Sequence, residues 1–315
     1  MFGFKGRYKV TMIKNPIKWP NGARCAVVFT WDMDADSIIH LAHPNDADTR
    51  LSTTSMLRYG PQIGVPRIID LCNELGVKHT FFVPGWCAEQ HPQAIELMVK
   101  NGHEVAMHGY LHEYPNLLTR EQEMFWTKKG TDAITKIAGR APVGYRAPWY
   151  RYSKHSTDIL AQLGFTWDTS LMGDDNPYLI RQAGGELIEL PSRWQLDDWP
   201  QFVHNHDLDF MMPIASPQYA MDVYMAEFYA MYEHGGIWLN CFHPFCSGQV
   251  ARLMMVKQMM LKMLEKGDVW IATGEQVANY VREQVNAGKY VPRVDDLPFY
   301  EGRLPELAEN YAPGN

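Results

Sequence analysis

The sequence predicts an α/β fold in which strands and helices alternate around a closed parallel barrel. Short apolar runs, typical of strands buried on both faces, alternate with stretches of helical periodicity along the chain. Seven or eight such strand–helix units follow one another in 315 residues without a linker or a low-complexity break. A doubly wound open sheet is the alternative, but the glycine-rich dinucleotide-binding fingerprint is missing after the first strand.

The predicted elements come in a regular order. Strands are expected over residues 23–31, 77–83, 103–107, 143–147, 165–169, 186–190, 236–242 and 268–272. Helices are expected over residues 65–75, 92–100, 119–137, 153–163, 216–233, 250–266 and 274–285. Residues 40–62 and 192–210 are expected to be irregular loops that cover a site. We expect a single domain, 1–315, with the barrel at about 23–285 and terminal extensions at 1–22 and 286–315.

Composition and charge exclude several classes of protein. The chain has a net charge of -7 and no run of Lys and Arg, which argues against a nucleic-acid partner. No apolar stretch is long enough to span a membrane. Residues 1–16 lack the apolar segment of a signal peptide, so a cytoplasmic location is expected. The five cysteines form no C-x-x-C pair and are expected to be reduced thiols.

Three acids at alternate positions follow the first predicted strand: Asp32, Asp34 and Asp36. Charges just past a buried strand are costly unless something binds there. A helix cap or a turn is the alternative, since Asp is favoured in both. We interpret the acids as part of a site, because barrel strands deliver their catalytic groups at this end.

The stretch HEVAMHGYLHEYP carries His108 and His112. If the chain turns helical after His108, both imidazoles share one helical face and can bind the same metal ion. Two unrelated surface histidines are the alternative. Arg146 ends the fourth predicted strand and His243 follows the seventh. In a parallel barrel all these strand ends lie on the face that carries active sites.

This set of side chains suits metal-assisted hydrolysis. Asp34, His108 and His112 would make a two-histidine, one-carboxylate triad with positions left for water and substrate. A metal there would polarise a carbonyl and lower the pKa of its water. Zinc suits these ligands best, and cobalt, nickel and manganese are alternatives.

Two further residues would transfer protons, and a third would support one of them. Asp32 could take the proton of the attacking water, and Arg146 would keep that carboxylate ionised. His243 could protonate the departing nitrogen. Each has another interpretation, because Arg146 could be a structural ion pair and His243 could simply end a strand.

The segments FTWDMDAD, HGYLH, YRAPWY and CFHPF, in that order, resemble the motifs of the polysaccharide deacetylase (NodB-homology) superfamily. The resemblance runs from about residue 23 to 285 and implies a distorted (β/α) barrel of metal-dependent hydrolases that deacetylate N-acetylated sugars. Matched position by position, it implies the same roles for the six residues above. It adds the backbone N–H near Trp149 as a group that holds the oxyanion.

Several positions depart from the family pattern. Met33 separates two aspartates that are usually adjacent, and Trp149 stands where Tyr is usual. These features, with SLMGDDNPY, are similar to an intracellular branch that includes a peptidoglycan-deacetylase-like protein, cyclic imide hydrolases and a metal-independent allantoinase. That resemblance implies a homotetramer. The retained ligand triad argues against the metal-independent case.

The substrate is therefore expected to be a small cyclic imide or ureide. A deacetylase of N-acetylated glycans is the alternative, and a non-catalytic sugar- or metal-binding barrel is a third. The loops carry Trp194, Trp199 and Phe202, which could close over a small ligand. Expected substrate contacts are Trp149, Asp175, Trp194 and Asp198, and it stays open whether Asp198, Asp175 or another acid tunes His243.

Overall fold

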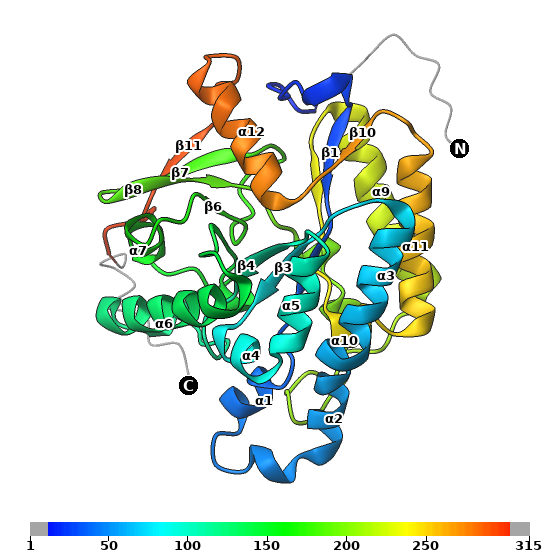
Figure 1. Ribbon diagram of the computed structural model, residues 1–315. Helices are drawn as coiled ribbons and strands as arrows, with labels where there is room; N and C mark the ends of the chain where they lie inside the picture. Colours follow the sequence, from blue (N-terminus) through cyan, green and yellow to red (C-terminus); the bar gives the residue numbers. More distant parts are fainter. Residues whose placement is uncertain (1–11, 303–315) are drawn as a thin grey trace, which may run out of the picture.

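The computed structural model describes residues 12–302 of the chain (Figure 1). Its strands are β1 (Cys25–Val28), β2 (Thr30–Asp32), β3 (Thr80–Val83), β4 (Glu104–Met107), β5 (Gly144–Tyr145), β6 (Trp167–Asp168), β7 (Tyr178–Gln182), β8 (Gly185–Glu189), β9 (Ile237–Leu239), β10 (Val269–Ile271) and β11 (Val294–Asp296). They form a sheet of order β11-β7-β8-β6-β5-β4-β3-β2 and a smaller sheet of order β10-β1-β9. Every pairing is parallel except that of β7 with β8. The predicted distorted α/β barrel is confirmed.

Helices surround these strands (Figure 1). They are α1 (Ser37–Ala42), α2 (Leu51–Tyr59), α3 (Val65–Leu75), α4 (Gly85–Gln90), α5 (Pro92–Lys100), α6 (Arg120–Ala138), α7 (Ser156–Gln162), α8 (Trp199–Phe202), α9 (Pro217–His234), α10 (Pro244–Ser247), α11 (Val250–Leu264) and α12 (Gly274–Asn286). Capping boxes at Thr119 and Thr273 begin α6 and α12, and left-handed glycines at 76 and 235 end α3 and α9.

The first predicted strand, 23–31, is divided in two. β1 pairs with β9 and β10, whereas β2 pairs with β3, and Phe29 lies between them. The chain therefore passes from the smaller sheet to the larger one at Phe29. An isolated bridge between Trp31 and Phe242 connects the two sheets at the same place. A continuous apolar run does not reveal such a change of partner, because both halves are fully buried.

One other prediction is wrong, and two strands were not predicted. Residues 40–62, expected to be irregular, contain the second half of α1, all of α2 and the start of a π-helical turn, Gly60–Gly64. The strand predicted at 186–190 is β8, but its hairpin partner β7 was not predicted. The tail also contributes β11, which pairs with β7, so the sheet extends past residue 285. Of the expected terminal extensions, 1–22 and 286–315, residues 1–11 and 303–315 lie outside the described residues.

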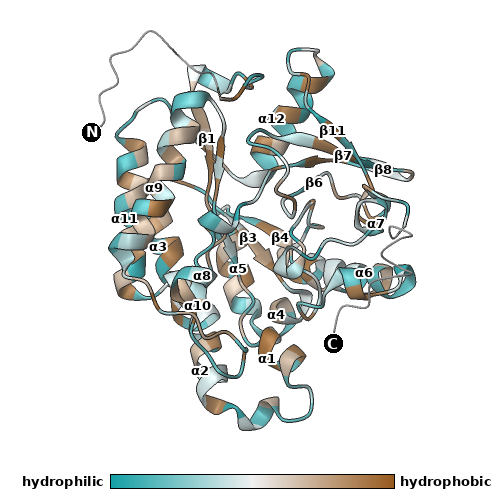
Figure 2. Ribbon diagram, turned by 180° about the vertical axis from the view of Figure 1, so that it is seen from behind, coloured by the Kyte–Doolittle hydropathy of each residue, from teal (hydrophilic) through white to brown (hydrophobic). Residues whose placement is uncertain are grey.

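The core fills the space between strands and helices. Aromatic side chains such as Trp31, Phe82 and Trp167 are fully buried, and burying one Phe contributes about 1.5–3 kcal/mol. Gly144 and Gly274 let Trp167 approach, because a Cβ on either would lie 2.2 Å from its ring. Brown stretches on β1, β3 and β4 contrast with the mixed colours of the outer helices (Figure 2).

Two predictions about the whole chain can be compared with the structure. All five cysteines are buried free thiols, which confirms the prediction of reduced cysteines. Within residues 12–302, no helix combines the length and the apolar character needed to cross a membrane.

Candidate active site

Two aspartates enter the site from the end of β2. Asp32 is the last residue of the strand, Asp34 follows two positions later, and both are buried. The Asp32 N–H donates to Phe242 O (2.7 Å) and the Met33 N–H donates to Phe82 O (2.8 Å). Because these bonds run to segments on both sides, the backbone that carries the carboxylates is fixed.

His108 and His112 come from the loop after β4 and not from a helix. Gly109 (φ 71°) and His112 (φ 65°) both have left-handed backbone conformations, which turn the loop back on itself. The prediction of a shared helical face is therefore wrong, although the centroids of the His108 and His112 rings still lie 4.9 Å apart. His108 Nδ1 is 2.7 Å from Arg146 O, which leaves Nε2 directed at the site.

Asp34, His108 and His112 form a set that fits a divalent metal ion. One ligand atom from each lies within 4.8 Å of the other two. Asp34 Oδ1 is buried and accepts no hydrogen bond from any residue between 12 and 302. Burial raises the pKa of Asp34 to about 8, so the ionised carboxylate needs a cation beside it. Burial also lowers the pKa of His108 to about 4, which leaves its lone pair free.

Asp32 is paired with Arg146, as predicted for an oriented base. The guanidinium Nη1 donates to Asp32 Oδ1 and to Thr30 Oγ1 (3.0 Å), and Nη2 donates to Asn240 O (3.4 Å). Burial acts to raise the pKa of Asp32, but Arg146 and the nearby imidazoles outweigh burial and hold that pKa below its ordinary value. The carboxylate therefore stays ionised. The Cys241 thiol donates to its other oxygen (3.2 Å).

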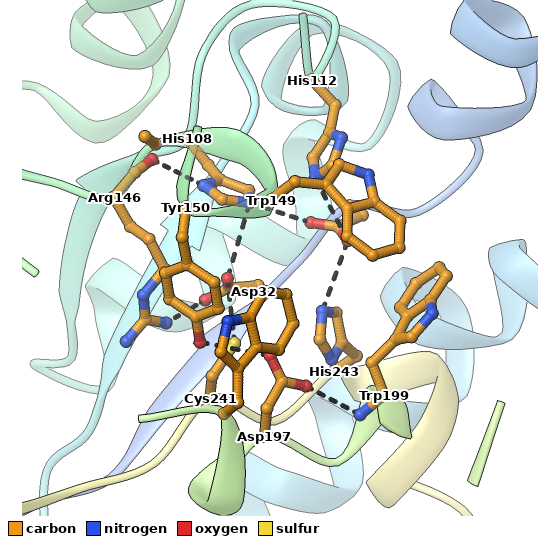
Figure 3. A pocket seen from close by; sticks show the side chains of 13 residues that line it. Asp32, His108, His112, Arg146, Trp149, Tyr150, Asp197, Trp199, Cys241 and His243 are labelled. Atoms are coloured by element: carbon orange, nitrogen blue, oxygen red, sulfur yellow. Dashed lines mark hydrogen bonds and ion pairs between the residues drawn. The ribbon is translucent and has the colours of Figure 1, made fainter. Parts of the chain in front are cut away.

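His243 is held by Asp198, which answers the question of which acid tunes it. The ring Nδ1 of His243 lies 2.6 Å from Asp198 Oδ1, and the backbone N–H of His243 donates to Asp198 Oδ2 (3.1 Å). Burial acts to lower the pKa of His243, but Asp198 outweighs burial and raises that pKa to about 10. The ring is thus protonated at neutral pH. Its Nε2 faces Asp34 Oδ2 at 3.5 Å (Figure 3).

Aromatic rings form the wall opposite these polar groups (Figure 3). The rings of Trp149 and Trp199 meet edge to face at 5.0 Å, and those of Tyr150 and Trp194 at 4.8 Å. Tyr150 OH donates to Asp197 Oδ2 (3.1 Å). The wall and the polar groups line one cavity.

The structure brings most of the predicted site residues to this one cavity. Its lining includes eight of them: Asp32, Asp34, His108, His112, Arg146, Trp149, Trp194 and His243. Asp198 lies behind His243 and does not line the cavity. Asp175 lies outside the site, where its exposed carboxylate pairs with Arg193 (2.5 Å).

Besides Ala147, three lining residues were not predicted: Tyr150, Asp197 and Cys241. Each is a near neighbour in sequence of a residue that was predicted, namely Trp149, Asp198 and His243. That adjacency was the available signal. At Tyr150 the backbone also has a left-handed conformation (φ 56°), and such bends are not visible in residue patterns.

Comparison with known proteins identifies the family. The solved structure of a candidate polysaccharide deacetylase from Mycobacterium smegmatis is 39% identical, and the match covers 91% of this chain and 98% of that one with a TM-score of 0.85. The chain belongs to the polysaccharide deacetylase family. The family model described as "Polysaccharide deacetylase" matches residues 56–167. Members of this metal-dependent family hydrolyse carbon–nitrogen bonds other than peptide bonds, and the resemblance inferred from four motifs is confirmed.

Two other proteins similar to this chain differ from each other in activity. A peptidoglycan deacetylase of Helicobacter pylori is 26% identical over 252 residues, which are 71% of this chain and 86% of that protein. The structure of an allantoinase is 20% identical with a TM-score of 0.76, covering 89% of this chain and 96% of that one. At that identity the likeness concerns the fold alone.

Proposed function

We propose that this chain is a metal-dependent hydrolase, most consistent with zinc, that opens a carbon–nitrogen bond in a small cyclic imide or ureide-like substrate. The observation that carries the proposal is the meeting of three functions in one buried cavity. These are a set of metal ligands, an ionised base in Asp32 and a protonated acid in His243. Such opposed pKa values within one site are typical of acid–base catalysis.

The chain's own residues would divide the proton transfers between them. A metal held by Asp34, His108 and His112 would polarise the substrate carbonyl and make water more acidic. Asp32 takes the proton of the attacking water, and its pairing with Arg146 keeps it ready to do so. His243 gives its Nε2 proton to the nitrogen as the carbon–nitrogen bond breaks. The N–H of Trp149 would help hold the negative oxygen.

The lining of the cavity supports a small substrate. Trp149, Trp194 and Trp199 crowd the space in front of the polar groups, so little free volume remains there. The loop that carries Trp194 and Trp199 is braced from outside, because Asp207 pairs with Arg50 and accepts from Thr53 (2.5 Å). A polymer would need a longer, open groove.

The charged side chains that line the cavity support an uncharged substrate. Both cations among the lining residues are already paired, Arg146 with Asp32 and His243 with Asp198. Asp197 adds a carboxylate to the wall. A substrate that carries its own carboxylate would meet this acid, and the lining side chains offer no unpaired cation to offset it, so only the bound metal could do so.

A second candidate is the deacetylation of an N-acetylated glycan. It is supported by the 39% identity to the Mycobacterium smegmatis protein and by the match to the Helicobacter pylori enzyme. The same base and acid would serve, with the acetyl group in place of the ring carbonyl. A short N-acetyl sugar is favoured over a cell-wall polymer, because the aromatic wall stands in front of the polar groups.

The experiment combines metal analysis with turnover. Purified protein is assayed for bound metal and with succinimide, hydantoin, allantoin, a hydantoin bearing a carboxylate, and an N-acetylglucosamine oligomer. About one metal per chain, with turnover of the neutral rings, is expected. The Asp32→Asn variant should lose turnover and keep its metal, whereas the matched control Asp175→Asn, outside the cavity, should keep both.

Each other outcome has a defined meaning. Turnover of the sugar oligomer alone would replace the imide proposal by the deacetylase. Full activity in Asp32→Asn would contradict the assigned base, and absence of any turnover would favour a non-catalytic barrel. Light scattering on the same sample tests the homotetramer expected from the resemblance.

A further inference from the structure

The loop between the two candidate histidine ligands is held by the next residue in the chain. The carboxylate of Glu113 accepts the N–H of Tyr110 at both oxygens (2.9 and 3.1 Å) and the N–H of Leu111 at Oε2 (2.7 Å). Successive backbone N–H groups beside a left-handed residue, here Gly109, form a concave site for an anion. Glu113 fills that site from its own chain.

The opposite side of the same loop is tied to α4. Gly109 O accepts the Gly85 N–H (2.9 Å), and Tyr110 O accepts the Trp86 N–H (2.8 Å). The carbonyl groups of the loop are thus fixed by a helix, while its N–H groups are fixed by Glu113. Removing the carboxylate would release only one of the two sides, so the protein should still fold.

His112 depends on this loop more than His108 does. His108 directly follows β4, and its N–H donates to Val83 O (3.1 Å). His112 instead has a left-handed backbone (φ 65°), which a non-glycine residue keeps only where its surroundings impose it. From that conformation its Nε2 reaches within 3.6 Å of Asp34 Oδ2.

We propose that Glu113 is a positioning residue of the metal site, which sets the direction of His112 through the backbone of the loop. It contacts neither the metal position nor the substrate cavity. The inference rests on the proposed metal site formed by Asp34, His108 and His112.

The test measures metal affinity of the metal-free protein. Zinc binding is followed in competition with a chromophoric chelator for wild type and Glu113→Gln. The variant should bind zinc about 10–100-fold more weakly, as is usual when a residue that orients a ligand is lost. The visible spectrum of the cobalt-loaded variant should also change, because the position of His112 is altered.

A matched control comes from α4, the helix that holds the other side of the loop. Glu89 accepts the Tyr110 OH (2.9 Å) without touching the loop backbone, so Glu89→Gln should bind zinc within twofold of wild type. Equal zinc affinity and an unchanged cobalt spectrum in Glu113→Gln would overturn the inference.

Two further outcomes keep the test decisive. If wild type binds no metal, the proposed function fails first. If circular dichroism shows Glu113→Gln to be unfolded, Glu113→Asp, which keeps the charge but shortens the reach, takes its place. Weaker zinc binding by that folded variant supports the inference, and wild-type affinity overturns it.

Discussion

His108 and His243 are buried in the same cavity, yet their pKa values move in opposite directions. Burial lowers the pKa of His108 to about 4, even with Asp32 3.5 Å from its Nε2. Burial acts the same way on His243, but the hydrogen-bonded carboxylate of Asp198 raises that pKa to about 10. Both rings are buried, so the hydrogen-bonded carboxylate, and not the extent of burial, decides which imidazole carries a proton and which offers a lone pair.

The two aspartates of β2 repeat this contrast with the sign reversed. Arg146 holds the pKa of Asp32 low, whereas burial raises that of Asp34 to about 8. Each pair thus contains one member whose pKa is set mainly by a hydrogen-bonded side chain of opposite charge and one whose pKa is set mainly by burial. The second kind, His108 and Asp34, belongs to the candidate metal site, and the first kind, Asp32 and His243, would transfer protons.

The largest effect is expected from His108→Ala, which removes a lone pair from the site. Metal content should fall from about one per chain to almost none, and turnover should fall to the background rate. Elemental analysis and the substrate assay measure both. Turnover by a metal-free His108→Ala protein would show that His108 is not a ligand of a catalytic metal.

Asp198→Asn would make His243 resemble His108. The general acid works while protonated, and in wild type its raised pKa keeps it so up to about pH 10. Without the carboxylate the pKa falls, so the alkaline limb of the pH profile of kcat/KM should move to lower pH. At pH 8 we expect a loss of about 10²–10⁴-fold, with metal content unchanged. An unmoved alkaline limb would contradict the role of Asp198.

Glu104 extends the comparison to the opposite end of β4. Burial raises its pKa to about 7, above the ordinary 4.5, so the folded protein binds a proton there more tightly than the unfolded chain. Stability should therefore fall as pH rises from about 4.5 to 7, by about 3 kcal/mol at most. In the wild type, Thr80 Oγ1 and the Glu275 N–H both donate to the Glu104 carboxylate. Glu104→Gln keeps an oxygen that can accept these two bonds.

Urea unfolding at several pH values checks this prediction. The slope of the free energy of unfolding between pH 4.5 and 7 should be smaller in Glu104→Gln than in wild type. Identical slopes would show that another group is responsible for the pH dependence.

The smallest effect is expected from the aromatic wall, which carries no charge pair. Trp194 is 41% exposed, so Trp194→Ala should fold normally. It should raise KM for a neutral ring about tenfold, equivalent to about 1.4 kcal/mol, and leave kcat and metal content alone. Steady-state kinetics separates these terms, and a fall in kcat with KM unchanged would place Trp194 in the chemistry instead of binding.

The sequence predicted which residues meet in the candidate site better than it predicted the backbone that carries them. Asp32, Asp34, Arg146 and His243 were found because each follows a strand, and a parallel barrel gathers strand ends on one face. The same periodicity predicted the main strands and helices, since buried faces repeat regularly.

Features that depend on tertiary contacts were missed. The left-handed turns at His112 and Tyr150 have no residue signature, because glycine is the usual residue there. The change of sheet at Phe29 depends on which strands lie beside it, and α2 forms in a segment whose mixed composition gave no clear period.

The wall and the catalytic set also differ in what supports them. The acids and His243 follow strands, whereas Tyr150, Trp194 and Trp199 lie on single short turns between elements. Mutagenesis libraries restricted to those three aromatic positions should therefore change which molecules are accepted while sparing the reaction. The scaffold would then be a starting point for directed evolution toward other amides.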